Sequence, residues 1–165
     1  MKAAKAAIEP LGLVPLEDES KRLMFADDRE RFASFKVPSK PTYALVSSMD
    51  SLFLLRRNLS GLLSTEAAKV KVYGSKGACE LGSLSDLNSN AIVDRGTIIG
   101  LWEYDPTSSS IVWTTFAESD KTLHEVVSRT ESFIRDQLGD ARSFSLDSPK
   151  SRIPRIDAIR KAQKR

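Results

Sequence analysis

Residues 91–116, AIVDRGTIIGLWEYDPTSSSIVWTTF, decide the fold of this chain. They contain three apolar stretches, 91–93, 97–104 and 111–116, and turn-forming residues lie between these stretches. Gly96 can take the positive φ angle that a tight turn requires, and Asp105 followed by Pro106 suits a type I turn. The pattern therefore predicts a β-meander of three consecutive antiparallel strands.

The register of the second hairpin follows from its loop. If that loop closes symmetrically, Trp102 lies opposite Trp113 and Tyr104 lies opposite Ile111. Gly100 shares their face, where a side chain would crowd a neighbouring element. The opposite face is also apolar: Ile99, Leu101, Val112 and Phe116. Because both faces are apolar, we expect this hairpin in the centre of a sheet or barrel.

The strongest helix signal covers residues 119–138. Its apolar residues recur at helical spacing from Leu123 onward, Ser119 or Asp120 can cap its beginning, and Gly139 can end it. The expected fold class is therefore α+β, with an antiparallel β-meander or barrel-like sheet packed by a long C-terminal helix. Residues 141–146 are the candidate for a last strand.

The N-terminal region has the pattern of part of a winged helix. We expect a helix, two short strands and a second short helix in turn: 2–9, 13–16, 22–25 and 27–35. A helix followed by a small hairpin is typical of the end of a winged helix. Prolines 38 and 41 make 37–41 a stiff connector. The expected organisation is a partial winged-helix element, a β-rich domain and a basic tail: 1–36, 37–149 and 150–165.

The net charge of +3 is unevenly distributed. Residues 150–165 hold seven lysines and arginines against Asp157 alone, a net charge of +6, so the remaining chain carries −3. Such a tail would neutralise phosphates and give salt-dependent affinity for nucleic acid. A solvated terminus that aids solubility explains the same composition.

Six basic residues are the candidates for DNA contact: Arg56, Arg57, Arg95, Lys76, Arg152 and Arg155. Arg56 and Arg57 fall in a predicted helix, 51–63, and point about 100° apart, so only one of them can pack along the core. Arg95 lies at the tip of a tight turn. Ordinary surface charge is the alternative explanation at these positions.

The remaining candidates come from a turn and from the tail. Lys76 belongs to a glycine-framed turn, 74–77, which follows a strand expected at 70–73 and could touch a phosphate. A plain surface loop is the more frequent explanation of such a turn. Arg152 and Arg155 belong to the basic tail.

Common enzyme motifs are absent from the sequence. There is no P-loop, no G-x-G-x-x-G and no G-x-S-x-G. The only histidine, His124, has no second histidine to complete a metal site, so we expect it to pack or to face solvent. The only cysteine, Cys79, can form no disulfide within the chain, which fits a reduced, cytoplasmic setting. We expect no catalytic residue, cofactor or metal, and no membrane span or signal peptide.

Three segments together carry a family resemblance: residues 41–59, 72–106 and 144–156. They resemble the C-terminal part of bacterial winged-helix DNA-binding-domain proteins, the family of the crosslink-repair DNA glycosylases (AlkZ/YcaQ-like). Two features match. The first is a segment that begins with Asp50 and ends with the arginines Arg56 and Arg57. The second is a β-hairpin, Val93 to Trp102, in which Gly100 and Trp102 are separated by one residue. The likeness covers Leu11 to Arg155.

The resemblance implies tandem winged helices followed by a β-rich, barrel-like domain that together hold DNA. In the glycosylases a Gln-x-Gln-like motif near the N-terminus carries catalysis, whereas this chain has only Gln137 and Gln163. We therefore expect a DNA-binding module without that motif, which binds duplex DNA weakly and salt-dependently. The alternative is a structural or protein-interaction domain that scaffolds a missing N-terminal winged-helix segment or forms a homodimer.

Overall fold

The computed structural model describes residues 6–17, 21–56, 58–75, 77–142 and 147–164. The chain divides into two compact units, Met1–Ser39 (unit 1) and Lys40–Arg165 (unit 2). The division falls within the proline-bearing connector at 37–41. No described helix combines the length and the apolar character that a bilayer crossing requires.

Unit 1 consists of a helical turn, a hairpin and a short helix. Residues 6–8 are helical and continue into η1 (Glu9–Leu11), which is followed by β1 (Leu13–Pro15), β2 (Leu23–Phe25) and α2 (Asp28–Ser34). Gly12 ends the first turn with a φ of 57°. β1 and β2 pair antiparallel with Val14 opposite Met24, which confirms the predicted hairpin. The Asp27 side chain makes no capping hydrogen bond to α2. Residues 2–5 and 18–20 of the predicted elements lie outside the described residues.

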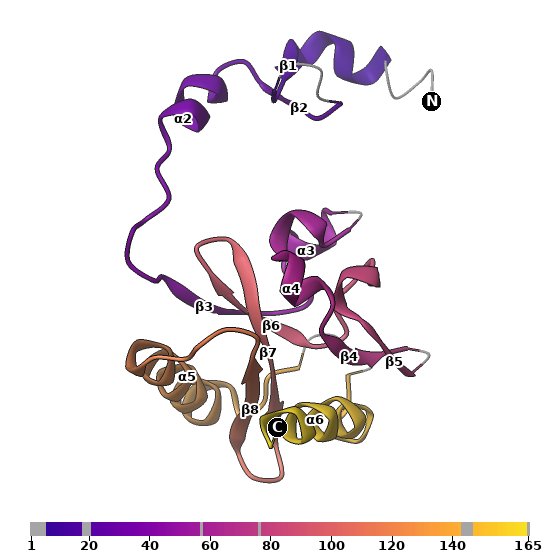
Figure 1. Cartoon of the computed structure of the whole chain (residues 1–165), viewed down its shortest axis with the longest axis vertical. Helices are drawn as coiled ribbons and strands as arrows, with labels where there is room; N and C mark the ends of the chain where they lie inside the picture. Colours follow the sequence, from indigo (N-terminus) through magenta and orange to yellow (C-terminus); the bar gives the residue numbers. More distant parts are fainter. Residues whose placement is uncertain (1–5, 18–20, 57, 76, 143–146, 165) are drawn as a thin grey trace. The chain divides into compact units, whose positions relative to one another are not determined.

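Unit 2 is built on a four-stranded antiparallel sheet with the strand order β3-β6-β7-β8 (Figure 1). Its strands are β3 (Tyr43–Val46), β6 (Asn90–Asp94), β7 (Thr97–Asp105) and β8 (Ser110–Thr115). The last three are the predicted meander. Trp102 lies opposite Trp113 and Tyr104 opposite Ile111, so the predicted register is also correct. The described strands form only open sheets, and the barrel-like closure is not shown.

A β-bulge in β7 changes one prediction about the two faces. Ile92 lies opposite Gly100 while Val93 lies opposite Ile98, so Ile99 has no partner of its own in β6. The extra residue reverses the alternation of side chains. Ile99 consequently packs in the cluster that contains Trp102, and Ile98 takes the predicted place of Ile99 on the face of Leu101.

Helices cover both faces of this sheet. α5 (Lys121–Phe133) packs over β3 and β8, and its side of the sheet holds the buried cluster around Trp102, Tyr104 and Leu123. α6 (Pro149–Gln163) packs over β7 and β8 on the opposite side, with Ile156 and Ile159 in the second cluster. The segment between β3 and β6 completes that second side with five short elements: α3 (Ser51–Leu54), η2 (Ser60–Leu62), α4 (Thr65–Ala68), β4 (Lys71–Gly74) and β5 (Gly77–Glu80), followed by η3 (Leu81–Ser83).

The predicted helix at 119–138 is present in two parts. Asp120 caps α5 by accepting a hydrogen bond from the backbone N–H of Leu123 at 2.8 Å. α5 passes into one π-helical turn, η4 (Ile134–Leu138), which ends at Gly139 with a φ of 73°. The expected cap and the expected terminator are both confirmed.

Two other predictions are wrong. Residues 149–163 form the helix α6, not a basic tail, because Ser148 caps its start and buried residues hold it to the sheet. The predicted helix at 51–63 breaks after α3, since the Asn58 side chain accepts a hydrogen bond from Ser60 N–H, an Asx turn that competes with helix. Ala141 and Arg142 belong to no strand, and the rest of the predicted last strand, 143–146, lies outside the described residues.

Candidate nucleic-acid interface

The side chain of Arg152, a predicted DNA contact, is completely buried, with an exposed fraction of 0%. Nη1 and Nη2 donate to the two carboxylate oxygens of Asp140, at 2.8 Å each. Nη1 is also 3.3 Å from the backbone oxygen of Tyr104. Arg152 therefore joins α6 both to β7 and to the segment that follows η4.

Arg155, one turn further along α6, bridges two more buried carboxylates. Its Nε donates to Glu103 Oε1 at 2.7 Å and its Nη2 donates to Asp147 Oδ1 at 2.6 Å. Glu103 and Asp147 are each 1% exposed. A third arginine of α6, Arg160, pairs with Asp105 at the end of β7. We call these ion pairs the α6 clamp: Arg152, Arg155 and Arg160 with Glu103, Asp105, Asp140 and Asp147.

Burial and ion pairing act against each other on the carboxyl groups of the clamp. Burial raises the pKa of Glu103 above its ordinary value, and the charge of Arg155 only partly offsets that effect. Burial also raises the pKa of Asp140, but the hydrogen bonds and charge of Arg152 outweigh it, so the Asp140 pKa lies below its ordinary value. Hydrogen bonds from Thr107 N–H and Arg160 likewise outweigh burial at Asp105 and lower its pKa.

The α6 clamp overturns the prediction that Arg152 and Arg155 reach out to DNA. Burying an arginine without a partner is very unfavourable, and both side chains are paired with carboxylates. Arg152 Nε, which is buried, has no hydrogen-bond partner among the described residues and lies 4.0 Å from Asp147 Oδ2. Their charge neutralises the interior of unit 2 and is not offered to an outside polyanion. Among the described cations of α6, Lys150, Lys161 and Lys164 are exposed and lie outside the clamp.

Arg95 occupies the predicted turn between β6 and β7, with a φ of 48°. Its Nε and Nη2 donate to Asp94 Oδ2 at 3.0 and 2.8 Å. The other oxygen of Asp94 accepts the backbone N–H of Thr42 at 2.7 Å. The turn is thereby tied to the first residues of unit 2, and the guanidinium is held in one direction with about a third of its side chain, 34%, exposed.

Electrostatics at this turn stabilise the charged forms of both partners. Burial raises the pKa of Asp94, but the hydrogen bonds from Arg95 and Thr42 outweigh it and leave the pKa lowered. The hydrogen bond to Asp94 raises the pKa of Arg95. Asp94 consequently offsets part of the positive charge that Arg95 can present to a phosphate.

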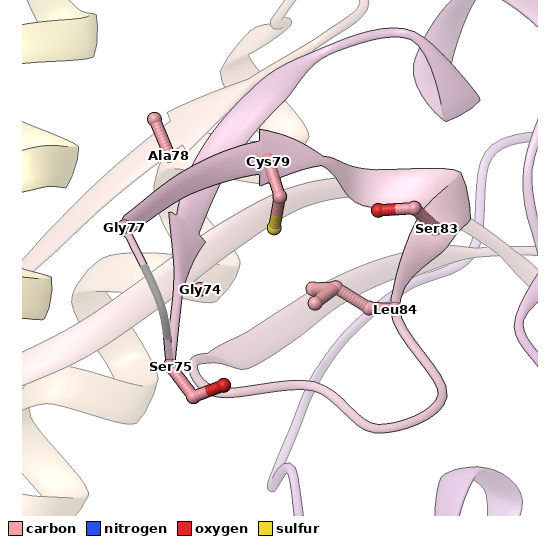
Figure 2. Close-up of a pocket in the computed structure, with 7 residues that line it drawn as sticks. All are labelled: Gly74, Ser75, Gly77, Ala78, Cys79, Ser83 and Leu84. Carbon is pink, nitrogen blue, oxygen red and sulfur yellow. The ribbon is translucent and has the colours of Figure 1, made fainter.

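The glycine-framed turn of the sequence lies at the end of the β4–β5 hairpin, where Gly74 pairs with Gly77. A cavity of about 220 Å³ opens beside it, and Cys79, Ser83 and Leu84 contribute to its lining (Figure 2). A Cβ on Gly74 would lie 2.6 Å from Cys79 Sγ, which explains the glycine at that position. The candidates Lys76 and Arg57 lie outside the described residues.

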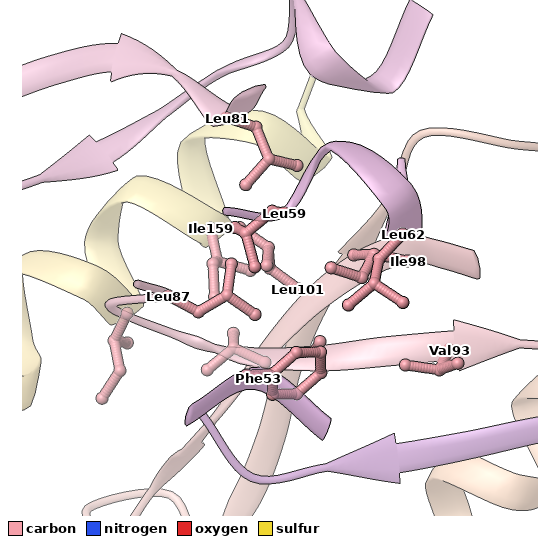
Figure 3. Close-up of a cluster of buried hydrophobic side chains, with 12 residues drawn as sticks. Phe53, Leu59, Leu62, Leu81, Leu87, Val93, Ile98, Leu101 and Ile159 are labelled. Carbon is pink, nitrogen blue, oxygen red and sulfur yellow. The ribbon is translucent and has the colours of Figure 1, made fainter. Parts of the chain in front are cut away.

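Arg56 is exposed and follows Leu55, the C-cap residue of α3. Phe53 and Leu62 flank Arg56 in the sequence, and Val93 and Ile98 flank the Asp94–Thr97 turn. All four side chains belong to one buried cluster (Figure 3). α3 and that turn lie at the same end of unit 2 (Figure 1). The segments that hold Arg56 and Arg95 therefore contribute to one buried cluster, although they are far apart in the sequence.

The only histidine of the sequence packs against an aromatic ring. His124 makes an edge-to-face ring contact with Trp113, with centroids 5.0 Å apart. The carboxylates of the α6 clamp were not singled out in the sequence. The available signal was the placing of Glu103 and Asp105 within an otherwise apolar strand, since buried acidic residues require partners.

Comparisons of this chain with protein-family models, with curated proteins and with solved structures give no match.

Proposed function

We propose that this chain is a DNA-binding module related to the winged-helix DNA glycosylases, and that it acts without their catalytic motif. The observation that carries the proposal is that Arg56 and Arg95 are both exposed and lie in segments that share one buried cluster of unit 2. Arg152 and Arg155, in contrast, are enclosed in the α6 clamp. Arginine is the side chain best suited to bind phosphate oxygens in pairs.

A direct link between the Arg95 turn and the start of unit 2 supports the same proposal. Thr42 donates its backbone N–H to Asp94, so the first residues of unit 2 lie beside that turn. The helix-then-hairpin order of unit 1 is the order expected for the last part of a winged helix, which supports a nucleic-acid role for that unit. In this proposal the contacts of unit 2 are mostly to the phosphate backbone.

Contacts from only two candidate arginines of unit 2, Arg56 and Arg95, imply weak binding with little sequence preference. Each phosphate contact releases counterions, and the logarithm of the binding constant falls with the logarithm of salt concentration by about 0.9 per contact. Fluorescence anisotropy with a labelled duplex, at about 50 and about 200 mM salt, tests the proposal. We expect binding at the lower concentration and a marked loss at the higher one. Absence of binding by the full chain at low salt would overturn it.

A second function is favoured by one feature of unit 1. None of its described residues is buried. Seven large apolar side chains are more than a third exposed: Ile8, Leu11, Leu23, Phe25, Phe32, Phe35 and Val37. Exposed apolar surface of this kind marks interaction sites. Unit 1 would then be a protein-interaction element that packs against a winged-helix partner or a second copy of the chain.

A further inference from the structure

A cavity of about 260 Å³ opens on the α5 side of the sheet, next to the edge strand β3. Leu45 of β3 and Trp102 of β7 line it from the sheet, and Phe133, Ile134 and Leu138 line it from the end of α5 and from η4. Neither proposed function uses this site. It lies under the π-helical turn, an irregularity that is frequent at functional sites.

The walls of the cavity favour an aromatic occupant. Phe133 and Leu138 line the cavity and are 54% and 58% exposed, although both are large and apolar. An apolar cavity of about 150 Å³ accommodates benzene in a well-studied protein. A volume of about 260 Å³ therefore has room for one aromatic ring with a short substituent.

Arg142 supplies one positive charge to the lining. Its side chain is exposed and makes no hydrogen bond or ion pair with any described residue. The nearby carboxylate of Asp140 attracts it, but both oxygens of that group already accept hydrogen bonds from Arg152. A single guanidinium matches a single carboxylate, whereas a doubly charged phosphate would leave one charge uncompensated against the apolar wall.

We propose that this cavity is a binding site for a compact aromatic carboxylate, with the ring against Trp102 and Phe133 and the carboxylate paired with Arg142. The ring gains by leaving water, and the guanidinium gives the preference for an acid over a neutral analogue. The site is separate from the arginines assigned to DNA, so its ligand binds whether or not the chain binds a duplex.

Titration of the full chain with phenylacetate, followed by calorimetry and by the two indole N–H signals in NMR spectra, tests the proposal. Phenylacetamide is the matched neutral probe, because it has the same number of non-hydrogen atoms. We expect a dissociation constant of about 1 mM for phenylacetate and about tenfold weaker binding of the amide. The signal of Trp102 should shift while that of Trp113 does not, and Trp113→Phe assigns the two signals.

The substitution Arg142→Gln should weaken phenylacetate to the level of the amide. Arg129→Gln is the control, since Arg129 is an exposed arginine of α5 that does not line the cavity. Equal affinity of the two variants for phenylacetate would overturn the proposal. So would a shift confined to Trp113, or the absence of heat and of any indole shift up to about 20 mM ligand, roughly twentyfold above the expected constant.

Discussion

Arg155 on α6 and Glu103 in the middle of β7 form a hydrogen-bonded ion pair of 2.7 Å, and the Glu103 side chain is only 2% exposed. The same arginine reaches Asp147, whose side chain is 1% exposed. One guanidinium thus compensates two carboxylates that water does not reach. The position of α6 on the sheet depends on this arrangement, since few apolar residues of α6 are buried: Ile156 and Ile159.

Arg155→Ala should therefore destabilise the protein strongly. The variant removes the guanidinium that pairs with Glu103 and Asp147, and breaking a buried ion pair costs about 3–5 kcal/mol in comparable sites. Ser89 still donates to Glu103, and Arg152 still lies 4.0 Å from Asp147. Arg160→Ala is the comparison on the same helix, because the Arg160 side chain is 43% exposed and Asp105 keeps its hydrogen bonds from Thr107 and Ser108, so we expect a smaller loss. Urea denaturation gives both free energies of unfolding. Equal losses in the two variants would contradict the structural role of Arg155.

Gly100→Ala should also destabilise the fold, by about 3 kcal/mol. A Cβ at this position would lie 2.3 Å from the backbone oxygen of Thr114, and a strand backbone has little freedom to move away. Gly61→Ala is the control, since its Cβ would meet only the flexible end of Arg56 at 3.3 Å. Thermal unfolding followed by circular dichroism distinguishes the two variants. An unchanged melting temperature for Gly100→Ala would show that β8 is not held against β7 as described.

The lowered pKa values of Asp94, Asp105 and Asp140 predict a loss of stability in acid. A carboxyl group with a lower pKa in the folded state stabilises the fold while it is ionised. That stability is complete above the ordinary pKa of about 3.9 and is lost as the pH falls through the folded-state value. Glu103 has the opposite sign, because its pKa is raised, so its own contribution improves as the pH falls through its folded-state value.

Asp140→Asn separates these effects. At neutral pH the variant should be less stable than the wild type, because Arg152 loses its charged partner. Between about pH 5 and about pH 3, however, the variant should lose less of its remaining stability than the wild type does, since one of the three groups no longer titrates. Denaturation curves at each pH provide the measurement. Parallel losses in both proteins would mean that Asp140 titrates normally in the folded state.

Arg56→Gln and Arg95→Gln should each reduce the salt dependence of duplex binding. If each arginine contacts one phosphate, the slope of log K against log salt becomes shallower by about 0.9 for each substitution. Arg129→Gln on α5 is the control, and it should leave the slope unchanged. Anisotropy titrations at several salt concentrations measure all three. If the control variant loses as much as the other two, the phosphate contacts are not specific to Arg56 and Arg95.

Replacing Phe32 and Phe35 by serine tests the interaction role of unit 1. These side chains are 54% and 69% exposed. We expect the wild-type chain to self-associate with increasing concentration and the double variant to sediment as a monomer, because apolar surface drives the association. Leu55→Ser in unit 2, where Leu55 is 84% exposed, controls for general loss of exposed apolar surface. A wild-type chain that stays monomeric at all concentrations would argue against self-association.

The local structure of the meander follows from the sequence by itself. Alternating apolar residues, Gly96 and the Asp105–Pro106 turn predict three strands and even the opposition of Trp102 and Trp113, which the register confirms. The same holds for the ends of α5 and η4, because Asp120 and Gly139 act on backbone groups within a few residues. Such signals can be read locally since both partners in the interaction are neighbours in the chain.

Tertiary structure alone decided what the arginines do. The composition of residues 150–165 predicts a basic tail. In the structure, however, carboxylates from other elements enclose Arg152 and Arg155, and one of them, Glu103, is 52 residues away from Arg155 in the sequence. Nothing near Arg155 in the sequence announces that partner, and a charge moves from solvent to the interior only when the fold supplies one. The bulge at Ile99 is a second case, because one unpaired residue exchanges the faces of its neighbours and depends on pairing with β6.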